Sequence, residues 1–309
     1  TTPGPESMFG PTAVRAAEMT PLSVPPLRYP RWHVLLVALA AVACYASTLG
    51  NELVLDDAPL VAYVERLHRE GGLWRVLTAD FRLWPAVPLG YYRPIVLLSV
   101  WVDARIPLPS PADYHLTNVA LNATSSVLVL LVARAIVRTP GAALLAGLLF
   151  AVHPVHTESV ALVAGRTDLW ASVFVLAASL MWARTAGQGL PAPPGMLVAG
   201  GLATALAALS KEVGFVAPIA LTGWHLLRAV GRGSWREVVS TGRPWFLAWA
   251  GGALVALAVR WLVANVDRVV SASAAQASPA LALGVWTRYL RMLLISWPLN
   301  AYYLPDQVA

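Results

Sequence analysis

The stretch HPVHTESVALVAGRTD, from His153 to Asp168, interrupts a chain that is otherwise strongly apolar. It holds two histidines, a glutamate, an arginine and an aspartate, although only 12% of the 309 residues are charged and 58% are apolar. A charge at the centre of a bilayer costs about 2.5–3.5 kcal/mol on insertion scales, so charges retained in apolar sequence indicate a function. We interpret this stretch as an active-site loop at a membrane surface.

The composition places the chain among multi-pass membrane proteins. Its mean hydropathy is +0.63, and each helical span needs about 17–25 mostly apolar residues. The single cysteine, Cys44, lies in the first apolar run, which excludes an intrachain disulfide. The net charge is +6, but the basic residues are spread between apolar runs, which argues against nucleic-acid binding.

The apolar runs predict an all-α bundle of about seven transmembrane helices. Residues 95–102 are too short to cross a bilayer before Asp103, so we place them at the interface. Residues 281–297 contain two arginines and are expected to be re-entrant or interfacial. The predicted spans are 33–50, 118–137, 141–151, 169–183, 196–209, 213–227 and 245–263.

Two parts are expected along the chain. Residues 1–32, rich in Pro, Ser and Thr, are typical of a disordered cytoplasmic tail, and residues 33–309 form the transmembrane catalytic domain. Within it we expect one external loop at about 51–114 and a second at 153–168. The chain starts without a methionine and stops soon after the motif-like YYLPD at 302–306, so we expect it to be a fragment.

The basic residues predict the orientation, because Lys and Arg concentrate in short cytoplasmic loops. With residues 95–102 at the interface, the arginine-rich loops fall on the same side as the N-terminus. We therefore predict a cytoplasmic N-terminus, with the polar motifs together on the periplasmic or endoplasmic reticulum lumenal face. The Ala-, Arg- and Pro-heavy composition favours a bacterial plasma membrane. The arginines concerned are Arg134, Arg138, Arg184, Arg228, Arg232, Arg236 and Arg243.

Asp56 and Asp57 follow the first span within a few residues. A partly desolvated aspartate binds protons more readily and can accept one from a hydroxyl nucleophile. The alternative is a pair of solvated loop acids, or a cap for a helix that begins at Ala58. We treat both aspartates as candidate catalytic residues.

The loop at 153–168 offers a second kind of site. His153 and His156, with Glu158, have a spacing compatible with a divalent metal that would bridge them to Asp56 or Asp57. Equally, the two imidazoles are suited to donate hydrogen bonds to a phosphate or to hold the loop. We favour the phosphate or structural roles over the metal.

Three cations expected on the external face are candidates for binding the phosphate of a donor: Arg93, Arg166 and Lys211. A guanidinium can grip a phosphate through two parallel hydrogen bonds, and a lysine acts as a point charge. For each residue alone, snorkelling at a span end is the simpler explanation. Their occurrence on one face favours phosphate binding. The supporting residues are expected to be Tyr92, Glu158, Asp168 and Glu212.

Several segments, in order, resemble the transmembrane and tetratricopeptide-repeat O-mannosyltransferases, which are GT-C membrane glycosyltransferases. The resemblance covers about residues 33–230, and its most specific part is the segment at 150–169. The matching segments are LVLDD at 53–57, ADF at 79–81, YYRPI at 91–95, HLTNV at 115–119, FAVHPVHTESVALVAGRTDL at 150–169 and LSKEVGF at 209–215.

The resemblance implies a GT-C-like bundle that transfers a sugar, expected to be mannose, from a polyprenyl-phosphate donor to a protein hydroxyl with inversion. By position, Asp56 matches the catalytic aspartate, with Asp57 beside it. The lipid-linked sugar is expected to be the donor substrate; no cofactor is expected besides the divalent metal that Asp56, His153 and His156 are the candidates to hold. The family usually carries C-terminal tetratricopeptide repeats, so we expect the chain to be the membrane part, truncated before them. Asn122 stands where members often have a histidine.

Three alternatives remain open. The same chemistry would serve a lipid or glycan acceptor. A transporter or flippase for a lipid-linked sugar would use the cations without chemistry, but it would need polar residues across the whole bilayer, whereas the motifs lie at one face. A non-catalytic scaffold would not need Asp, His, Arg and Lys to converge.

Overall fold

The computed structural model describes residues 30–81, 91–106, 109–137, 139–229 and 235–263. Within these ranges the chain is built from helices, and the one strand-like feature is an isolated bridge between Phe81 and Tyr91. The predicted all-α class is therefore confirmed. Most of the predicted tail at 1–32 and the predicted re-entrant segment at 281–297 lie outside the described residues.

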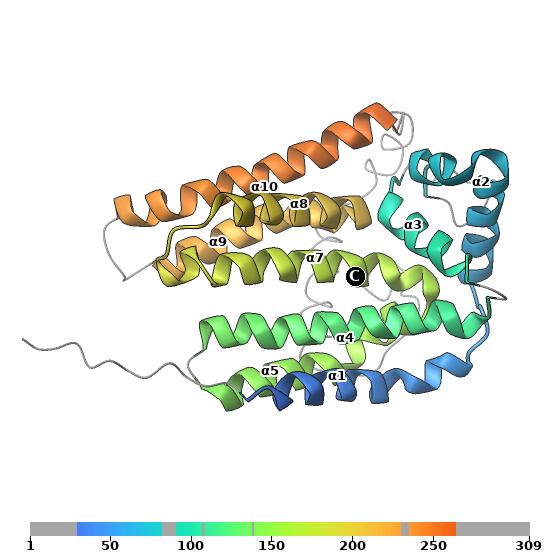
Figure 1. Ribbon diagram of the computed structural model, residues 1–309, viewed down its shortest axis with the longest axis horizontal. Helices are drawn as coiled ribbons and strands as arrows, with labels where there is room; N and C mark the ends of the chain where they lie inside the picture. Colours follow the sequence, from blue (N-terminus) through green and yellow to red (C-terminus); the bar gives the residue numbers. More distant parts are fainter. Residues whose placement is uncertain (1–29, 82–90, 107–108, 138, 230–234, 264–309) are drawn as a thin grey trace, which may run out of the picture.

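The longer helices lie side by side and alternate in direction (Figure 1). Two further helices, α2 (Asp57–Thr78) and α3 (Pro94–Asp103), lie at one end of this bundle, on the right in the figure. The bundle consists of α1 (Trp32–Tyr45), α4 (Pro111–Ile136), α5 (Pro140–Val152), α7 (Arg166–Ala183), α8 (Pro194–Ser210), α9 (Ala217–Ala229) and α10 (Trp235–Val263). Short helices connect them: η1 (Ala46–Gly50), η2 (Pro154–His156), α6 (Thr157–Ala161), η3 (Val163–Gly165), η4 (Ala186–Gln188) and η5 (Glu212–Val216).

Four segments within the described ranges are long and apolar enough to cross a bilayer, and α5 with the short helices after it makes a fifth if that pair, bent by 40°, counts as one span. At about 1.5 Å per residue, the 17 residues of α8 reach less than the roughly 30 Å of a hydrocarbon core. The predicted total of about seven spans is therefore not confirmed. The four segments are Trp32–Gly50, Pro111–Ile136, Val163–Ala183 and Val238–Val263.

The predicted first external loop contains α2, α3 and the start of α4. Helix α2 bends at Gly71 and Gly72, where Gly72 has a φ of +65° that favours glycine. Helix α3 begins at Pro94, a residue suited to the first turn, and ends after 10 residues at Asp103. This length is too short to cross a bilayer, as the sequence predicted for residues 95–102.

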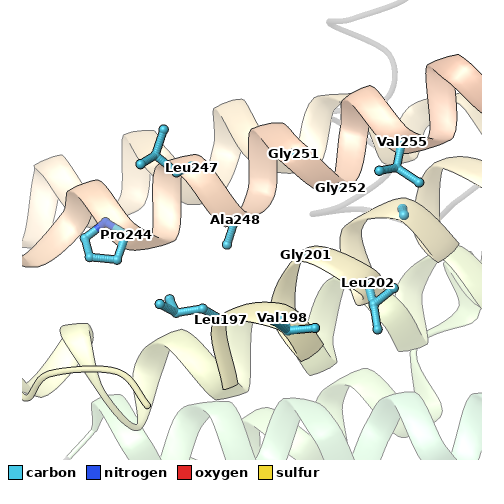
Figure 2. Close-up of a pocket in the computed structure, with 11 residues that line it drawn as sticks. Leu197, Val198, Gly201, Leu202, Pro244, Leu247, Ala248, Gly251, Gly252 and Val255 are labelled. Atoms are coloured by element: carbon cyan, nitrogen blue, oxygen red, sulfur yellow. The ribbon is translucent and has the colours of Figure 1, made fainter. Parts of the chain in front are cut away.

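Small residues allow α8 and α10 to approach closely. A Cβ at Gly252 would collide with the Gly201 carbonyl oxygen, so the two backbones meet there. Beside this crossing lies an apolar groove of about 510 Å³ (Figure 2). Its lining is made of glycines, a proline and aliphatic side chains, and it offers no titratable group. The chemistry must therefore be sought at the end of the bundle where the polar segments lie.

Candidate active site

The alternation of helix direction brings the predicted polar motifs to one end of the bundle. At this end α1, α5, α8 and α10 finish, α4 and α7 begin, and α2 and α3 are packed (Figure 1). The site residues predicted from the sequence therefore share one end, although they come from distant parts of the chain. They are Asp56, Asp57, Tyr92, Arg93, His153, His156, Glu158, Arg166, Asp168, Lys211 and Glu212.

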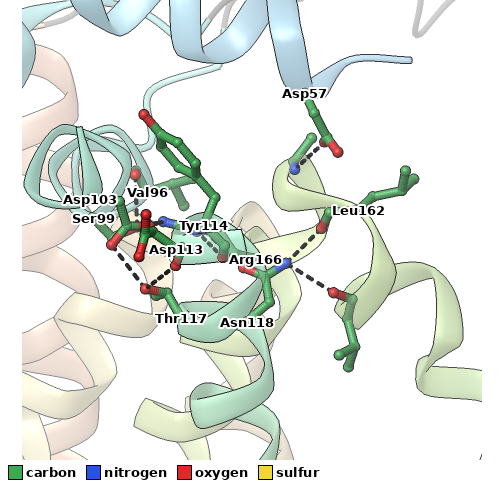
Figure 3. A network of polar contacts seen from close by, with 12 residues as sticks. Asp57, Val96, Ser99, Asp103, Asp113, Tyr114, Thr117, Asn118, Leu162 and Arg166 are labelled. Carbon is green, nitrogen blue, oxygen red and sulfur yellow. Dashed lines mark hydrogen bonds and ion pairs between the residues drawn. The ribbon is translucent and has the colours of Figure 1, made fainter. Parts of the chain in front are cut away.

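Asp56 and Asp57 open α2 but differ in their surroundings. Asp56 is the N-cap residue and is half-buried, whereas Asp57 is fully buried. The backbone N–H of Ala164 donates to Oδ1 of Asp57 over 2.8 Å, and Oδ2 is buried without a hydrogen-bond partner among the described residues (Figure 3). Burial raises the pKa of Asp57, and the Ala164 hydrogen bond opposes that shift. Asp57 therefore anchors the start of α2, and Asp56 is the more accessible carboxylate.

Arg166, the first residue of α7, is fully buried in a polar network (Figure 3). Because all three of its guanidinium nitrogens bond to the protein, this geometry gives no support to the predicted contact with a donor phosphate. The arrangement instead fixes the start of α7 against α3 and α4. Nε donates to Oδ1 of Asn118 (3.0 Å), Nη1 to Oδ2 of Asp103 (2.7 Å) and Oγ of Ser99 (3.2 Å), and Nη2 to the Tyr114 carbonyl (2.8 Å).

Lys211 and Asp168 join the end of α8 to the first turn of α7. The lysine Nζ lies 2.6 Å from each carboxylate oxygen. The lysine and aspartate side chains keep 31% and 43% of their surface exposed, so a ligand can reach both. Asp168 follows Ala164 by four residues, so this short stretch contacts Asp57 through Ala164 and Lys211 through Asp168.

Arg93 and Arg260 share Glu212 as their counter-ion. Arg93 Nη2 lies 2.6 Å from Oε2 of Glu212, and Arg260 Nη1 lies 3.2 Å from Oε1. Arg93 also lies over the rings of Tyr91 and Phe81, at 4.4 and 5.0 Å from their centroids. These contacts gather three helix ends, those of α3, α8 and α10, around one carboxylate.

The charge of Glu212 follows from these partners. Burial alone would raise its pKa, but the hydrogen bond and charge of Arg93, with a smaller contribution from Arg260, lower the pKa below the ordinary glutamate value. Glu212 is thus ionised at neutral pH. We name Arg93, Lys211 and Arg260 the cation cluster; its three positive charges exceed the two carboxylates of Asp168 and Glu212, which leaves a positive charge for an anionic ligand.

The two loop histidines have structural partners. His153 Nδ1 accepts from the Val155 N–H (3.2 Å), and the His153 carbonyl accepts from the Tyr45 hydroxyl (3.1 Å). The rings of His153 and His156 lie 6.0 Å apart, and His156 packs on Phe150. No group of three His, Cys, Asp or Glu residues suited to a metal occurs in the part of the chain that the structure describes. The geometry therefore favours the loop-holding role.

The predicted supporting residues separate into two groups. Asp168 and Glu212 pair with the cation cluster, as described above. The hydroxyl of the buried Tyr92 donates a hydrogen bond to the Leu77 carbonyl (2.8 Å), which fixes the backbone before α3. Glu158 is exposed to solvent. Tyr92 therefore supports the shape of this end of the bundle.

Sequence reasoning did not assign Asp103, Asn118 and Arg260 to the site. Asp103 served only to mark the end of an apolar run, yet it is the ionic partner of Arg166. Arg260 lies in the last turn of the apolar helix α10. A charge in such a helix signals a specific partner, so Arg260 could have been singled out, although its partner could not.

Comparison with known proteins identifies relatives of this chain. No family model matches the chain, and no solved structure matches it significantly. The mouse protein O-mannosyl-transferase TMTC3 is 33% identical over 188 residues, which is 59% of this chain and 20% of that protein. Drosophila melanogaster Tmtc1 is 34% identical over 195 residues, 62% of this chain and 22% of the relative.

A third relative extends further along the chain. Drosophila melanogaster protein O-mannosyl-transferase Tmtc2 is 31% identical over 264 residues, which is 82% of this chain and 27% of that protein. The chain thus spans between a fifth and slightly more than a quarter of the length of these curated relatives. The resemblance drawn from the motifs is confirmed: this chain is a homologue of part of the TMTC protein O-mannosyl-transferases.

Proposed function

We propose that this chain is the membrane-embedded catalytic part of a glycosyltransferase that moves mannose from a polyprenyl phosphate to a hydroxyl group of a protein. One observation carries the proposal. The five residues from Ala164 to Asp168, where η3 runs into α7, contact Asp57 at one end and Lys211 of the cation cluster at the other, and Asp57 adjoins Asp56 in the chain. A proton acceptor and a phosphate-binding group thus meet at one end of an apolar bundle. The names of the relatives support mannose as the sugar and a protein as the acceptor.

Asp56 is the proposed general base. It is half-buried at the start of α2, next to a carboxylate that is anchored by the Ala164 N–H. Leu55, immediately before it, has a φ of 50°, a left-handed conformation that is uncommon for a leucine and turns the chain sharply into the helix. This turn sets the direction in which the Asp56 side chain leaves the backbone.

The cation cluster is the proposed site of the donor phosphate. Lys211 offers a partly exposed ammonium group, and Arg93 and Arg260 add planar guanidinium groups that suit a phosphate. Each cation already has a carboxylate partner, which holds it in place before the donor arrives. Charge stabilisation by groups that need not reorganise is the largest contribution in many enzymes.

The reaction balances with these groups alone. The acceptor oxygen bonds to the anomeric carbon of the sugar and gives its proton to Asp56. The bond from the anomeric carbon to the phosphate oxygen breaks, and its electron pair leaves with the polyprenyl phosphate, whose charge the cation cluster stabilises. Attack from the face opposite the phosphate inverts the anomeric centre. A phosphate leaves readily, so one carboxylate suffices where soluble glycosidases use two.

The topology belongs to the same proposal. We place the polar end of the bundle on the extracytoplasmic face, periplasmic or lumenal, because the described arginines Arg134, Arg184 and Arg236 lie at the other end. A lipid-linked donor would then present its phosphate at the membrane surface where the cation cluster lies. The same arrangement would serve a lipid acceptor, which is the second candidate that the chemistry allows.

The test uses the purified protein in detergent with polyprenyl-phosphate mannose and a Ser/Thr-containing peptide. Release of polyprenyl phosphate and transfer to the peptide are measured for the wild type, Asp56→Asn and the control Glu52→Gln, with and without EDTA. Glu52 is an exposed carboxylate in the same stretch. We expect Asp56→Asn to lower turnover by about 10²–10⁴-fold, the usual contribution of a general base, and Glu52→Gln to leave it unchanged.

Each result has a distinct meaning. Wild-type turnover in Asp56→Asn removes Asp56 from the role of base. Release without transfer to the peptide, but with transfer to an added lipid, establishes the second acceptor class. Donor binding without release by the wild type favours transport, and loss of release in EDTA establishes a metal requirement.

A further inference from the structure

Asn118 lies on α4 at the centre of the polar network and is fully buried. Its two polar side-chain atoms have opposite roles in hydrogen bonding: one accepts and the other donates. Oδ1 accepts a hydrogen bond from Nε of Arg166 (3.0 Å), and Nδ2 donates to the Leu162 carbonyl (2.6 Å) (Figure 3). Nδ2 also lies 3.3 and 3.4 Å from the carbonyl oxygens of Val160 and Ser159. A single amide therefore bridges the arginine and the turn that precedes it.

That turn is the one that holds Asp57. The Gly165 N–H donates to the Leu162 carbonyl (3.0 Å), which closes a short turn with Ala164 inside it. The Ala164 N–H is thereby directed at Oδ1 of Asp57. A Cβ at Gly165 would lie 2.7 Å from the Cα of Ser159, so the turn is also pressed closely against α6. Any displacement of the turn moves the donor that anchors Asp57.

We call the pair of Asn118 and Arg166 the bridge. At its arginine end, the bridge is fixed to α3. Arg166 Nη1 donates to Oδ2 of Asp103, and the Thr117 hydroxyl donates to Oδ1 of the same carboxylate (2.9 Å). A buried charge that loses its partner costs several kcal/mol, so the pair of Arg166 and Asp103 has one strongly preferred arrangement. The bridge thus connects a rigid ion pair to the backbone of a turn.

We propose that Asn118 and Arg166 are positioning residues that fix the turn from Leu162 to Gly165 and, through the Ala164 N–H, the two aspartates at the start of α2. Neither residue touches the donor. Asp56 is one peptide unit from the anchored Asp57, and a displacement of about 1 Å at a reacting group can lower a rate about 100-fold. As far as activity reports on it, this inference rests on the proposed function.

Two variants separate the halves of the bridge. Asn118→Asp keeps an acceptor for Arg166 but removes the donor to the Leu162 carbonyl. Arg166→Lys keeps the charge beside Asp103 but removes the hydrogen bond to Asn118. In both we expect kcat to fall about 10–100-fold while the KM for the donor changes less than about twofold. A rise in donor KM for Arg166→Lys, with kcat unchanged, would mean that Arg166 binds the phosphate, and would overturn the proposal.

A matched control removes two buried hydrogen bonds at the other end of the bundle, since His225 also bonds through Nε2 to the Val238 carbonyl (3.0 Å). Trp182 Nε1 donates to Nδ1 of His225 (3.1 Å), and both residues are buried. We expect His225→Phe to destabilise the protein about as much as Asn118→Asp does and to leave kcat unchanged. If His225→Phe lowers kcat equally, the effect of Asn118→Asp is general loss of stability, and the positioning role is excluded.

A double-variant cycle tests the route of the effect. If Asn118 acts through Asp57, the variant Asp57→Ala with Asn118→Asp loses no more activity than the worse single variant. Losses that multiply would show that Asn118 acts independently of Asp57 and would contradict the proposal.

A measurement without turnover keeps this inference separate from the proposed function. Hydrogen exchange followed by mass spectrometry reports the protection of peptides that contain residues 160–168. We expect faster exchange there in Asn118→Asp and Arg166→Lys, and no change in His225→Phe. Unchanged exchange in both bridge variants overturns the positioning role even if the enzyme is active. Faster exchange in a protein without any transferase activity supports the positioning of the turn and leaves only the proposed function refuted.

Discussion

Lys211 reaches Asp168 from the end of α8, and its Nζ lies 2.6 Å from both carboxylate oxygens. The two residues are 43 positions apart in the sequence, so their contact depends on the packing of α8 against α7. Both side chains remain partly exposed, and such pairs contribute only about 0–1 kcal/mol to stability. The pair therefore adds little to folding, which is consistent with the proposed donor site, where Lys211 binds the phosphate.

The first prediction follows from that position. Lys211→Met removes the positive charge and keeps a flexible chain, so we expect the free energy of unfolding to change by less than about 1 kcal/mol. The KM for the donor should rise about tenfold, equivalent to about 1.4 kcal/mol of lost phosphate binding. Steady-state kinetics in detergent measure this, with Arg69→Gln, an exposed residue on α2, as control. An unchanged KM would remove Lys211 from the donor site.

The second prediction concerns Glu212, the shared counter-ion of Arg93 and Arg260. Glu212→Gln leaves two guanidinium groups without a negative partner, and we expect the free energy of unfolding at neutral pH to fall by about 1–3 kcal/mol. Because the pKa of Glu212 is lowered, its contribution is present above the ordinary value of 4.5 and is lost as the pH falls through the lower pKa of the folded state.

Thermal unfolding across a pH series tests this. The difference between the wild type and Glu212→Gln should close on acidification. Glu70→Gln is the control, because Glu70 pairs with Arg66 at 3.5 Å and both side chains are 45% exposed; its effect should stay within about 0.5 kcal/mol. A difference that persists below the lowered pKa of folded Glu212 contradicts the assignment.

The third prediction concerns Asp57, whose pKa is raised by burial. The folded state therefore holds the proton more firmly than the unfolded chain does. Stability falls as the pH rises from the ordinary value of 3.8 through the raised pKa. Asp57→Asn keeps an acceptor for the Ala164 N–H without the buried charge, so we expect it to unfold at a higher temperature than the wild type at neutral pH. The gain should shrink as the pH approaches 3.8.

Turnover measurements on the same variant distinguish the role of Asp57 from that of Asp56. If Asp57 anchors and Asp56 reacts, Asp57→Asn retains most of the turnover and Asp56→Asn loses it. Loss of turnover in Asp57→Asn, with turnover retained in Asp56→Asn, would assign the base to Asp57, and equal losses would show that both carboxylates are required. The exposed Glu52 again provides the control for a neutralised carboxylate.

The sequence predicted the positions of the longest helices better than their number. The predicted span 245–263 lies within α10, and 118–137 matches α4 up to its C-cap Val137, because apolar runs bounded by polar residues mark spans clearly. The shorter runs at 196–209 and 213–227 also became helices, but their lengths do not establish that they cross a bilayer. A hydropathy pattern gives the apolar length of a segment and not its tilt or its burial by neighbours.

The same limit applies to the candidate site. The motifs predicted that polar groups would gather at one face, and the structure places them at one end of the bundle. The pattern did not predict that Asp103, 63 positions before Arg166, would form an ion pair with its guanidinium group. A buried charge requires a partner, but the spacing of residues along the chain does not say which residue supplies it. Only the packing of α3 against α7 decides that Arg166 faces inward.

The last prediction concerns two adjacent glycines of α10. Both glycines line the apolar groove, but a Cβ at Gly251 meets no atom within 4 Å, whereas a Cβ at Gly252 collides with the Gly201 carbonyl of α8. Both substitutions to leucine have the same composition and nearly the same helix propensity effect, so the difference between them isolates helix packing. Gly251→Leu should leave the unfolding temperature unchanged or raise it.

Gly252→Leu should separate α8 from α10 and lower the free energy of unfolding by about 1–3 kcal/mol, as overpacked cores do. The displacement would also carry Arg260, two turns further along α10, away from Glu212. The variant should therefore raise the donor KM as Lys211→Met does, through loss of the cation cluster, while Gly251→Leu leaves it unchanged. Equal stability and equal KM in the two glycine variants would show that α8 and α10 do not meet at this crossing.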